Sequence, residues 1–93
     1  MITAAALRFK TTDGSEHIMP LHRHGDGFAI IAEFKIPYVK ESVEQGFINS
    51  TYKNGKWSYE FVNRIEAKKI AHACLQLKNL NDTYGELYSE DLW

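Results

Sequence analysis

The sequence has little of several features on which whole classes of protein depend. Its only cysteine, Cys74, cannot form an internal disulfide. Eleven basic residues against 12 acidic ones give a formal net charge of −1, so no overall positive field attracts duplex nucleic acid. Glu33 interrupts the most apolar stretch, which excludes a transmembrane helix, and no positively charged segment precedes an apolar one as in a signal peptide. These absences predict a cytoplasmic protein.

The composition that remains is that of one globular domain spanning residues 1–93. Hydrophobic residues make up 44% of the chain and charged residues 25%, which is ordinary for a folded domain. Ninety-three residues are too few for two independent cores, a TIM barrel or a Rossmann domain. Aromatic residues, at 13%, are somewhat abundant for so small a core, which favours a homo-oligomer.

Two β-hairpins are indicated by turn motifs between extended runs. Asp13-Gly14 separates the first ten residues from a return strand at 16–21, and Asn54-Gly55 separates strands at 45–52 and 57–62. In the last strand Trp57, Tyr59 and Phe61 alternate onto one face. We expect that face to lie against a helix.

Two helices and a docking tail complete the pattern. The first is predicted at 28–36, with Asp26 as its N-cap. The second runs from the N-cap Asn63 to about residue 78, and its periodicity places Cys74 on the apolar face as an inert thiol. Residues 86–93 keep apolar side chains and are predicted to dock on the core or on another subunit. The predicted fold class is α+β, an antiparallel sheet from two hairpins with two helices on one face, in the order β-β-α-β-β-α.

Cations near the two predicted helix starts form a candidate anion site. Arg64, Lys68 and His72 follow one another at four-residue intervals along one side of the second helix. Arg23 precedes the first helix, and free backbone N–H groups at a helix start also favour anions. The alternative for the row on the second helix is a solvated helix face.

Chemistry beyond anion binding has weaker support. His22, His24 and Asp26 have metal-like spacing, but the chain lacks the further ligands that known sites of this kind need, and a polar loop is the simpler interpretation. No Ser-His-Asp order and no Gly-rich phosphate loop is present, so we predict no enzymatic activity, no metal and no cofactor. Trp57 and Tyr52, near the second turn, could stack on a nucleobase or fill a subunit interface.

Short motifs follow one another along nearly the whole chain: Ile2-Thr3-Ala4-Ala5, Arg23-His24-Gly25-Asp26, Gln45-Gly46-Phe47, Phe61-x-x-Arg64-x-Glu66-Ala67-x-x-Ile70-Ala71 and Tyr88-Ser89-Glu90-Asp91-Leu92-Trp93. In this order they resemble the Thoeris anti-defence family of small phage proteins, the first described type of nucleotide sponge. The resemblance implies immune evasion in the infected bacterial host, by non-enzymatic capture of a cyclic ADP-ribose signal at subunit interfaces. Some members also take cyclic oligonucleotides. It marks four ligand-binding positions: Arg23, His24, Phe47 and Arg64.

Lys68 and Trp57 join these four as candidate ligand-binding residues on the arguments from charge and aromaticity given above. Two other functions stay open. One is a phage inhibitor that binds a host defence enzyme, for which a net charge of −1 permits a hydrophobic interface but not nucleic-acid mimicry. The other is a small phosphodiesterase that uses His22, His24 and Asp26.

Overall fold

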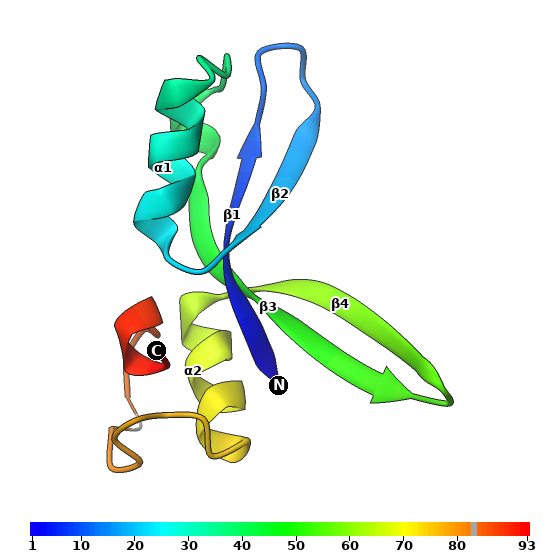
Figure 1. Cartoon of the computed structure of the whole chain (residues 1–93), viewed down its shortest axis with the longest axis vertical. Helices are drawn as coiled ribbons and strands as arrows, with labels where there is room; N and C mark the ends of the chain where they lie inside the picture. The colour runs from blue at the N-terminus through cyan, green and yellow to red at the C-terminus, as the bar shows by residue number, and fades with distance from the viewer. Residues whose placement is uncertain (83) are drawn as a thin grey trace.

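The computed structural model describes residues 1–82 and 84–93. The strands and helices follow one another in this order: β1 (Ile2–Lys10), β2 (Glu16–Leu21), α1 (His24–Glu33), the short 3-10 helix η1 (Lys40–Ser42), β3 (Glu44–Lys53), β4 (Lys56–Asn63), α2 (Arg64–Ala73) and the 3-10 helix η2 (Ser89–Asp91). Figure 1 shows them as one sheet with both α-helices on the same side. The predicted α+β class and its β-β-α-β-β-α order are confirmed.

The sheet joins the two hairpins side by side in the order β2-β1-β3-β4, with every pair antiparallel. Both hairpin turns use the expected residues, since Gly14, Asn54 and Gly55 all have positive φ angles. β1 is central and pairs with β2 on one side and β3 on the other. Because β1 reaches only as far as Asn49 of β3, the end of the second hairpin extends beyond the sheet.

The core lies between the sheet and its helices. Helix α1 packs over β1 and β2, where Leu7 and Ile31 are buried together. Helix α2 packs over β1, β3 and β4, and its two small residues Ala67 and Ala71 approach Phe47 closely. Leu7, Phe47, Ala67 and Ala71 have no exposed surface at all, so this face carries most of the burial that stabilises the fold.

Helix α1 differs from its prediction at both ends. It begins at His24 rather than at residue 28, and Arg23, not Asp26, is its N-cap residue. Gly27 explains the early start, because a Cβ there would lie only 2.5 Å from the side chain of Leu7, so glycine lets the first turn pack directly on β1. The helix ends at Glu33, before the predicted Ile36, because Lys35 adopts a positive φ of 51°.

Helix α2 is shorter than predicted, and this corrects the expectation for Cys74. The helix ends at Ala73, and Leu75 has a φ of 57°, which turns the chain away from the helical path. Cys74 is therefore exposed instead of lying on the apolar face. Beyond the turn, Gln76 returns to the sheet and exchanges hydrogen bonds of 2.8 and 2.7 Å with the backbone of Ile2.

The aromatic face of β4 also differs from the prediction. Val62 pairs with Phe47, and both point toward the helices. Because side chains alternate along a strand, Trp57, Tyr59 and Phe61 lie on the opposite face of the sheet, away from α1 and α2. The sequence-based expectation that they would pack against a helix was wrong.

The C-terminal segment lies between the two helices (Figure 1). Leu87 is fully buried, and its backbone N–H donates to the carbonyl oxygen of Arg64 at 3.0 Å. Trp93 packs on the core and donates from Nε1 to the carbonyl oxygen of His22 at 2.7 Å. Within the described residues, neither helix has the length and apolar character that crossing a membrane would require.

Candidate functional site

The face of the sheet opposite the helices, which we call the open face, is apolar and has no layer over it. The β-pairing places two rows of side chains there from β3 and β4: Ile48, Ser50 and Tyr52 opposite Phe61, Tyr59 and Trp57. β1 and β2 extend the face with Ala4, Pro20 and Ile18. Tyr52, Trp57 and Tyr59 are each more than half exposed, so the most aromatic surface of the molecule faces solvent.

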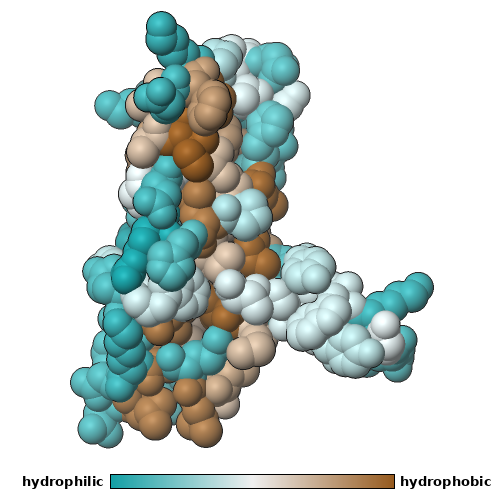
Figure 2. All heavy atoms as spheres, in the orientation of Figure 1, coloured by the Kyte–Doolittle hydropathy of each residue, from teal (hydrophilic) through white to brown (hydrophobic). Residues whose placement is uncertain are grey.

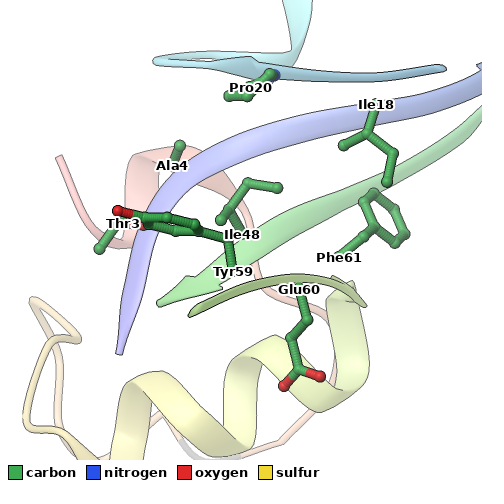
Figure 3. A pocket seen from close by; sticks show the side chains of 8 residues that line it. All are labelled: Thr3, Ala4, Ile18, Pro20, Ile48, Tyr59, Glu60 and Phe61. Carbon is green, nitrogen blue, oxygen red and sulfur yellow. The ribbon is translucent and has the colours of Figure 1, made fainter. Parts of the chain in front are cut away.

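A hollow of about 470 Å³ lies on the open face, lined by Thr3, Ala4, Ile18, Pro20, Ile48, Tyr59, Glu60 and Phe61. We call it the apolar hollow. Figure 3 shows Ile18 and Phe61 at one end of it and Tyr59 at the other, while the carboxylate of Glu60 points away. Its walls come from all four strands, so its shape depends on the register of the whole sheet.

Phe61 forms the floor at one end because Gly46 makes room for it. A Cβ on Gly46 would lie 2.3 Å from the Phe61 ring and 2.4 Å from the backbone oxygen of Val62, so only glycine fits beneath the ring. Above the ring lies the guanidinium of Arg8, 4.5 Å from the ring centroid, and this group also pairs with Glu44. Arg8 therefore lies over a ring that lines the apolar hollow, with its charge already compensated by Glu44.

The end of the second hairpin, residues 51–58, extends beyond β1 and is called the arm. Figure 2 shows the arm standing away from the body, with hydrophilic side chains at its tip. Its Tyr52 and Trp57 rings contact each other with centroids 5.2 Å apart. They are 61% and 54% exposed, on the same face as the apolar hollow. Sequence reasoning had singled out Trp57 as a ligand-binding residue, and the structure places it here, exposed.

A second hollow of about 430 Å³ continues from the first, lined by Thr3, Ala4, Pro20, Leu21, His22 and Trp93. We call it the His22 hollow. It shares Thr3, Ala4 and Pro20 with the apolar hollow, so the two form one continuous groove. The rings of His22 and Trp93 lie against each other at its end, with centroids 5.4 Å apart and planes tilted by 31°.

Arg23 follows His22 in the chain but is not among the residues that line the His22 hollow. Its side chain is 39% exposed, and its contact with Glu90 is long, at 4.0 Å. An exposed pair of this kind contributes little to stability, and the guanidinium remains free to bind an anion. Of the three cations named as ligand-binding candidates, Arg23, Arg64 and Lys68, Arg23 is the least constrained.

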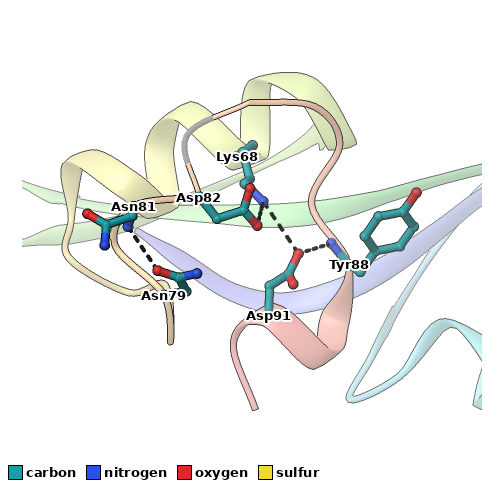
Figure 4. A network of polar contacts seen from close by, with 6 residues as sticks. All are labelled: Lys68, Asn79, Asn81, Asp82, Tyr88 and Asp91. Carbon is teal, nitrogen blue, oxygen red and sulfur yellow. Dashed lines mark hydrogen bonds and ion pairs between the residues drawn. The ribbon is translucent and has the colours of Figure 1, made fainter.

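Lys68 is buried and paired within the chain. Only 3% of its side chain is exposed, and its amine lies 2.7 Å from Asp82 and 3.6 Å from Asp91 (Figure 4). Burial by itself lowers the pKa of Lys68, but the hydrogen bond that its amine donates to Asp82 and the charges of both carboxylates outweigh it, so the pKa lies above its ordinary value. Asp91 also accepts from the backbone N–H of Tyr88, so Lys68 fixes the C-terminal segment onto α2.

Arg64 is likewise held by the C-terminal segment. Its guanidinium lies 2.9 Å from Glu86 and 5.3 Å from the centroid of the Tyr88 ring. Asn63 caps the same helix by accepting from the N–H of Glu66 at 2.8 Å. The carboxylate that balances Arg64 thus comes from its own chain. Arg64 and Lys68 lie on the helix side of the sheet, away from the groove.

His24 and Phe47 belong to the core. The Nε2 atom of His24 donates to the carbonyl oxygen of Gly46 at 2.7 Å, and its ring meets the Phe47 ring edge-on at 5.0 Å. His24 is 9% exposed and Phe47 is 0% exposed, so a ligand reaches neither ring in this structure. The histidines of the proposed metal motif have separate partners, and within residues 1–82 and 84–93 no three metal-binding side chains come together.

Sequence reasoning missed Arg8, Ile18, Pro20 and Tyr59 as members of a surface site. Ile18 and Pro20 lie on β2, which is an edge strand, where proline is tolerated because it needs no ladder hydrogen bond. The alternation in β1 and β2 could have grouped them on one face. Which face the helices leave open depends on the register between strands, and no local pattern reveals that.

Comparison with known proteins gives one match. The model of the phage T4 y16D protein family matches residues 1–93, which is the whole chain. No curated protein and no solved structure matches the chain.

Proposed function

We propose that this chain, which belongs to the phage T4 y16D protein family and so is a small phage protein, captures a cyclic ADP-ribose type signalling nucleotide of the infected cell and holds it without cleaving it. The resemblance of its motifs to Thoeris anti-defence sponges suggests the ligand. The observation that carries the proposal is the groove, where an exposed aromatic ring, Tyr59, borders a ligand-sized hollow. Arg23, the residue after His22, has only a long contact with Glu90.

The two ends of the groove suit different parts of a nucleotide. Aromatic rings offer stacking surfaces to a base, and Tyr59 and Trp93 both border the groove near Thr3. Arg23 provides a planar guanidinium for phosphate at the His22 end. The volumes of the hollows, about 470 and 430 Å³, lie within the range of small-ligand sites. We therefore propose that the nucleotide lies at the His22 end of the groove.

Capture without cleavage is the form of binding that these side chains favour. Among the described residues that line the groove, the hydroxyl of Thr3 bonds to the hydroxyl of Ser50 at 2.6 Å and not to a base that could activate it. The ring of His22 lies in tilted contact with the ring of Trp93. A sponge acts by stoichiometry in the host cytoplasm, so it needs tight binding, about −12 kcal/mol for a nanomolar dissociation constant.

The experiment that tests this proposal separates capture from catalysis. The purified protein is incubated with cyclic ADP-ribose isomers or cyclic oligonucleotides, freed of unbound ligand by gel filtration, and heated. We expect intact nucleotide in the heated supernatant, in stoichiometric amount. Recovery of a cleaved product would instead support the phosphodiesterase that uses His22, His24 and Asp26. Recovery of no nucleotide would overturn the proposal.

The arm favours a second candidate function, an inhibitor that binds a host defence enzyme. Tyr and Trp are enriched at protein interfaces, and Tyr52 and Trp57 are exposed on a segment that stands away from the body. If the heated protein releases no nucleotide, capture of a host enzyme through the arm becomes the hypothesis to test.

A further inference from the structure

We infer that the open face is covered by a second copy of this chain, with the arm of each protomer lying in the apolar hollow of the other. Binding of the partner's arm in the apolar hollow does not depend on the nucleotide proposal. One consequence does rest on the proposed function: the partner's arm would also form a wall of the nucleotide site at the His22 end.

Both halves of a self-complementary interface are present on one face of one chain. The apolar hollow is recessed, and the Tyr52–Trp57 ring pair of the arm projects on the same face. A two-fold axis that brings one arm into the partner's hollow brings the second arm into the first hollow. A different partner protein would need to match both features independently, whereas a second copy matches them by symmetry.

The arm lacks support in the single chain. Every residue from 51 to 60 is exposed, and beyond β1 the two strands of the hairpin pair only with each other. An isolated two-stranded hairpin is only marginally stable in water, and packing against another surface stabilises it. The apolar hollow of a second copy provides such a surface.

The charges on the open face permit its burial. Arg8 is paired with Glu44 in its own chain, so covering it leaves no uncompensated charge. At the tip of the arm, Lys53 lies opposite Lys56 in the β3–β4 register, one position along from Tyr52 and Trp57. Successive side chains of a strand point to opposite faces. The lysines therefore point to the other side of the arm, and the ring pair can be buried without them.

The exposed area is close to what a stable dimer needs. Tyr52, Trp57 and Tyr59 are 61%, 54% and 67% exposed, and Ile18 is 46% exposed. Since an aromatic side chain buries roughly 150–250 Å², these residues together with Pro20 and Phe61 provide on the order of 600 Å² per chain. A standard interface buries about 800 Å² per partner, and the rest of the arm can supply the difference.

A matched pair of substitutions tests where the interface lies. Ile18 and Ile65 are both isoleucines of similar exposure, 46% and 54%, but Ile18 lies on the open face and Ile65 on α2. The mass of the full chain is measured by sedimentation equilibrium at micromolar concentration, without nucleotide. We expect a dimer for the wild type and for Ile65→Lys, and a monomer for Ile18→Lys. A monomeric wild type, or dissociation by Ile65→Lys and not by Ile18→Lys, would overturn the inference.

A mixing experiment tests the reciprocal arrangement. Trp57→Ala removes the arm's ring, and Ile18→Lys blocks the hollow, so each variant alone has two defective contacts and is expected to be monomeric. A mixed dimer keeps one intact contact, between the arm of the Ile18→Lys chain and the hollow of the Trp57→Ala chain. We expect mixing to restore dimers, with a dissociation constant at least tenfold weaker than that of the wild type. Absence of mixed dimers would overturn the arm-in-hollow arrangement.

These outcomes are distinguishable from failure of the proposed function. A dimer that takes up no nucleotide would refute the sponge and leave the interface standing. A monomer that retains cyclic ADP-ribose through gel filtration would refute the interface and leave the sponge standing.

Discussion

The two faces of the sheet are built from the same strands, yet they differ completely in what covers them. On the helix side, Leu7 and Phe47 have no exposed surface, whereas on the open face Trp57 and Tyr59 are 54% and 67% exposed. Hydrophobic side chains on the helix side have their partners within the chain. The comparison indicates that one face of the sheet stabilises the fold, whereas the other leaves aromatic side chains exposed for the contacts proposed above.

The same division applies to the cations. On the helix side, Lys68 is paired with Asp82 and Arg64 with Glu86, and both carboxylates belong to residues that follow α2 in the chain. Arg23, next to His22 in the chain, has only a 4.0 Å contact with a largely exposed Glu90. Lys68 and Arg64 are therefore held more closely than Arg23, which is the most available of the three to an anionic ligand.

The largest effect on the free energy of unfolding is expected from shortening a side chain on the helix side of the sheet, that of Phe47. Phe47→Ala removes a fully buried ring between β3, His24 and α2, and we expect it to lower the free energy of unfolding by about 3–5 kcal/mol. Urea denaturation followed by circular dichroism measures the change. A loss of under about 1 kcal/mol would mean that the helix side is not the core that the structure shows.

Lys68 gives the next largest effect and a pH dependence. Lys68→Met is expected to destabilise the fold by about 2 kcal/mol, because two charge-assisted contacts to Asp82 and Asp91 are lost. Since the folded-state pKa of Lys68 lies above the ordinary 10.5, its contribution is fully present below pH 10.5 and is lost as the pH rises through the folded-state value. Thermal unfolding at a series of alkaline pH values should show this loss in the wild type and not in Lys68→Met.

Two glycines of α1 sharpen the comparison within one helix. A Cβ on Gly27 would lie 2.5 Å from Leu7 and 2.6 Å from Leu21, whereas one on Gly25 would meet nothing within 4 Å. We expect Gly27→Ala to cost about 1–3 kcal/mol through overpacking, and Gly25→Ala to stabilise by about 0.5 kcal/mol by restricting the unfolded chain. Equal effects of the two substitutions on the urea midpoint would contradict the close contact of α1 with β1.

The smallest effect on folding is expected on the open face. Trp57→Ala, measured in the Ile18→Lys background so that assembly does not contribute, should change the free energy of unfolding by less than about 0.5 kcal/mol, as for other exposed positions. The reference is Ile18→Lys alone under the same denaturation conditions. A loss comparable to that of Phe47→Ala would show that the arm is part of the core.

The fold was largely predictable because its signals are local. Asp13-Gly14 and Asn54-Gly55 fixed two hairpins, and Asn63 with Glu66 fixed the start of α2. The choice of face was not predictable, since it depends on the pairing of Val62 with Phe47 across two strands. One register step decides whether Trp57 or its neighbours face the helices.

The candidate site was less predictable than the fold, because the carboxylates that pair with its cations lie far from them in the sequence. Lys68 has the spacing of a solvated row, but its partners Asp82 and Asp91 lie in a later segment without helical periodicity. Arg64 meets Glu86 in the same way. Trp57, by contrast, was singled out from its place near the turn as a ring that could stack on a base or fill a subunit interface, and it is exposed.

The measurement that tests the central claim most directly is isothermal titration of cyclic ADP-ribose into Trp57→Ala and Arg64→Ala. Circular dichroism serves as the check that both are folded. If the arm of the partner chain forms a wall of the nucleotide site, as inferred above, Trp57→Ala should weaken affinity about tenfold or more, the effect of losing one stacking contact. Arg64→Ala, whose guanidinium is paired with Glu86 behind the sheet, should stay within about threefold of the wild type. Wild-type affinity in Trp57→Ala together with lost binding in Arg64→Ala would contradict the account.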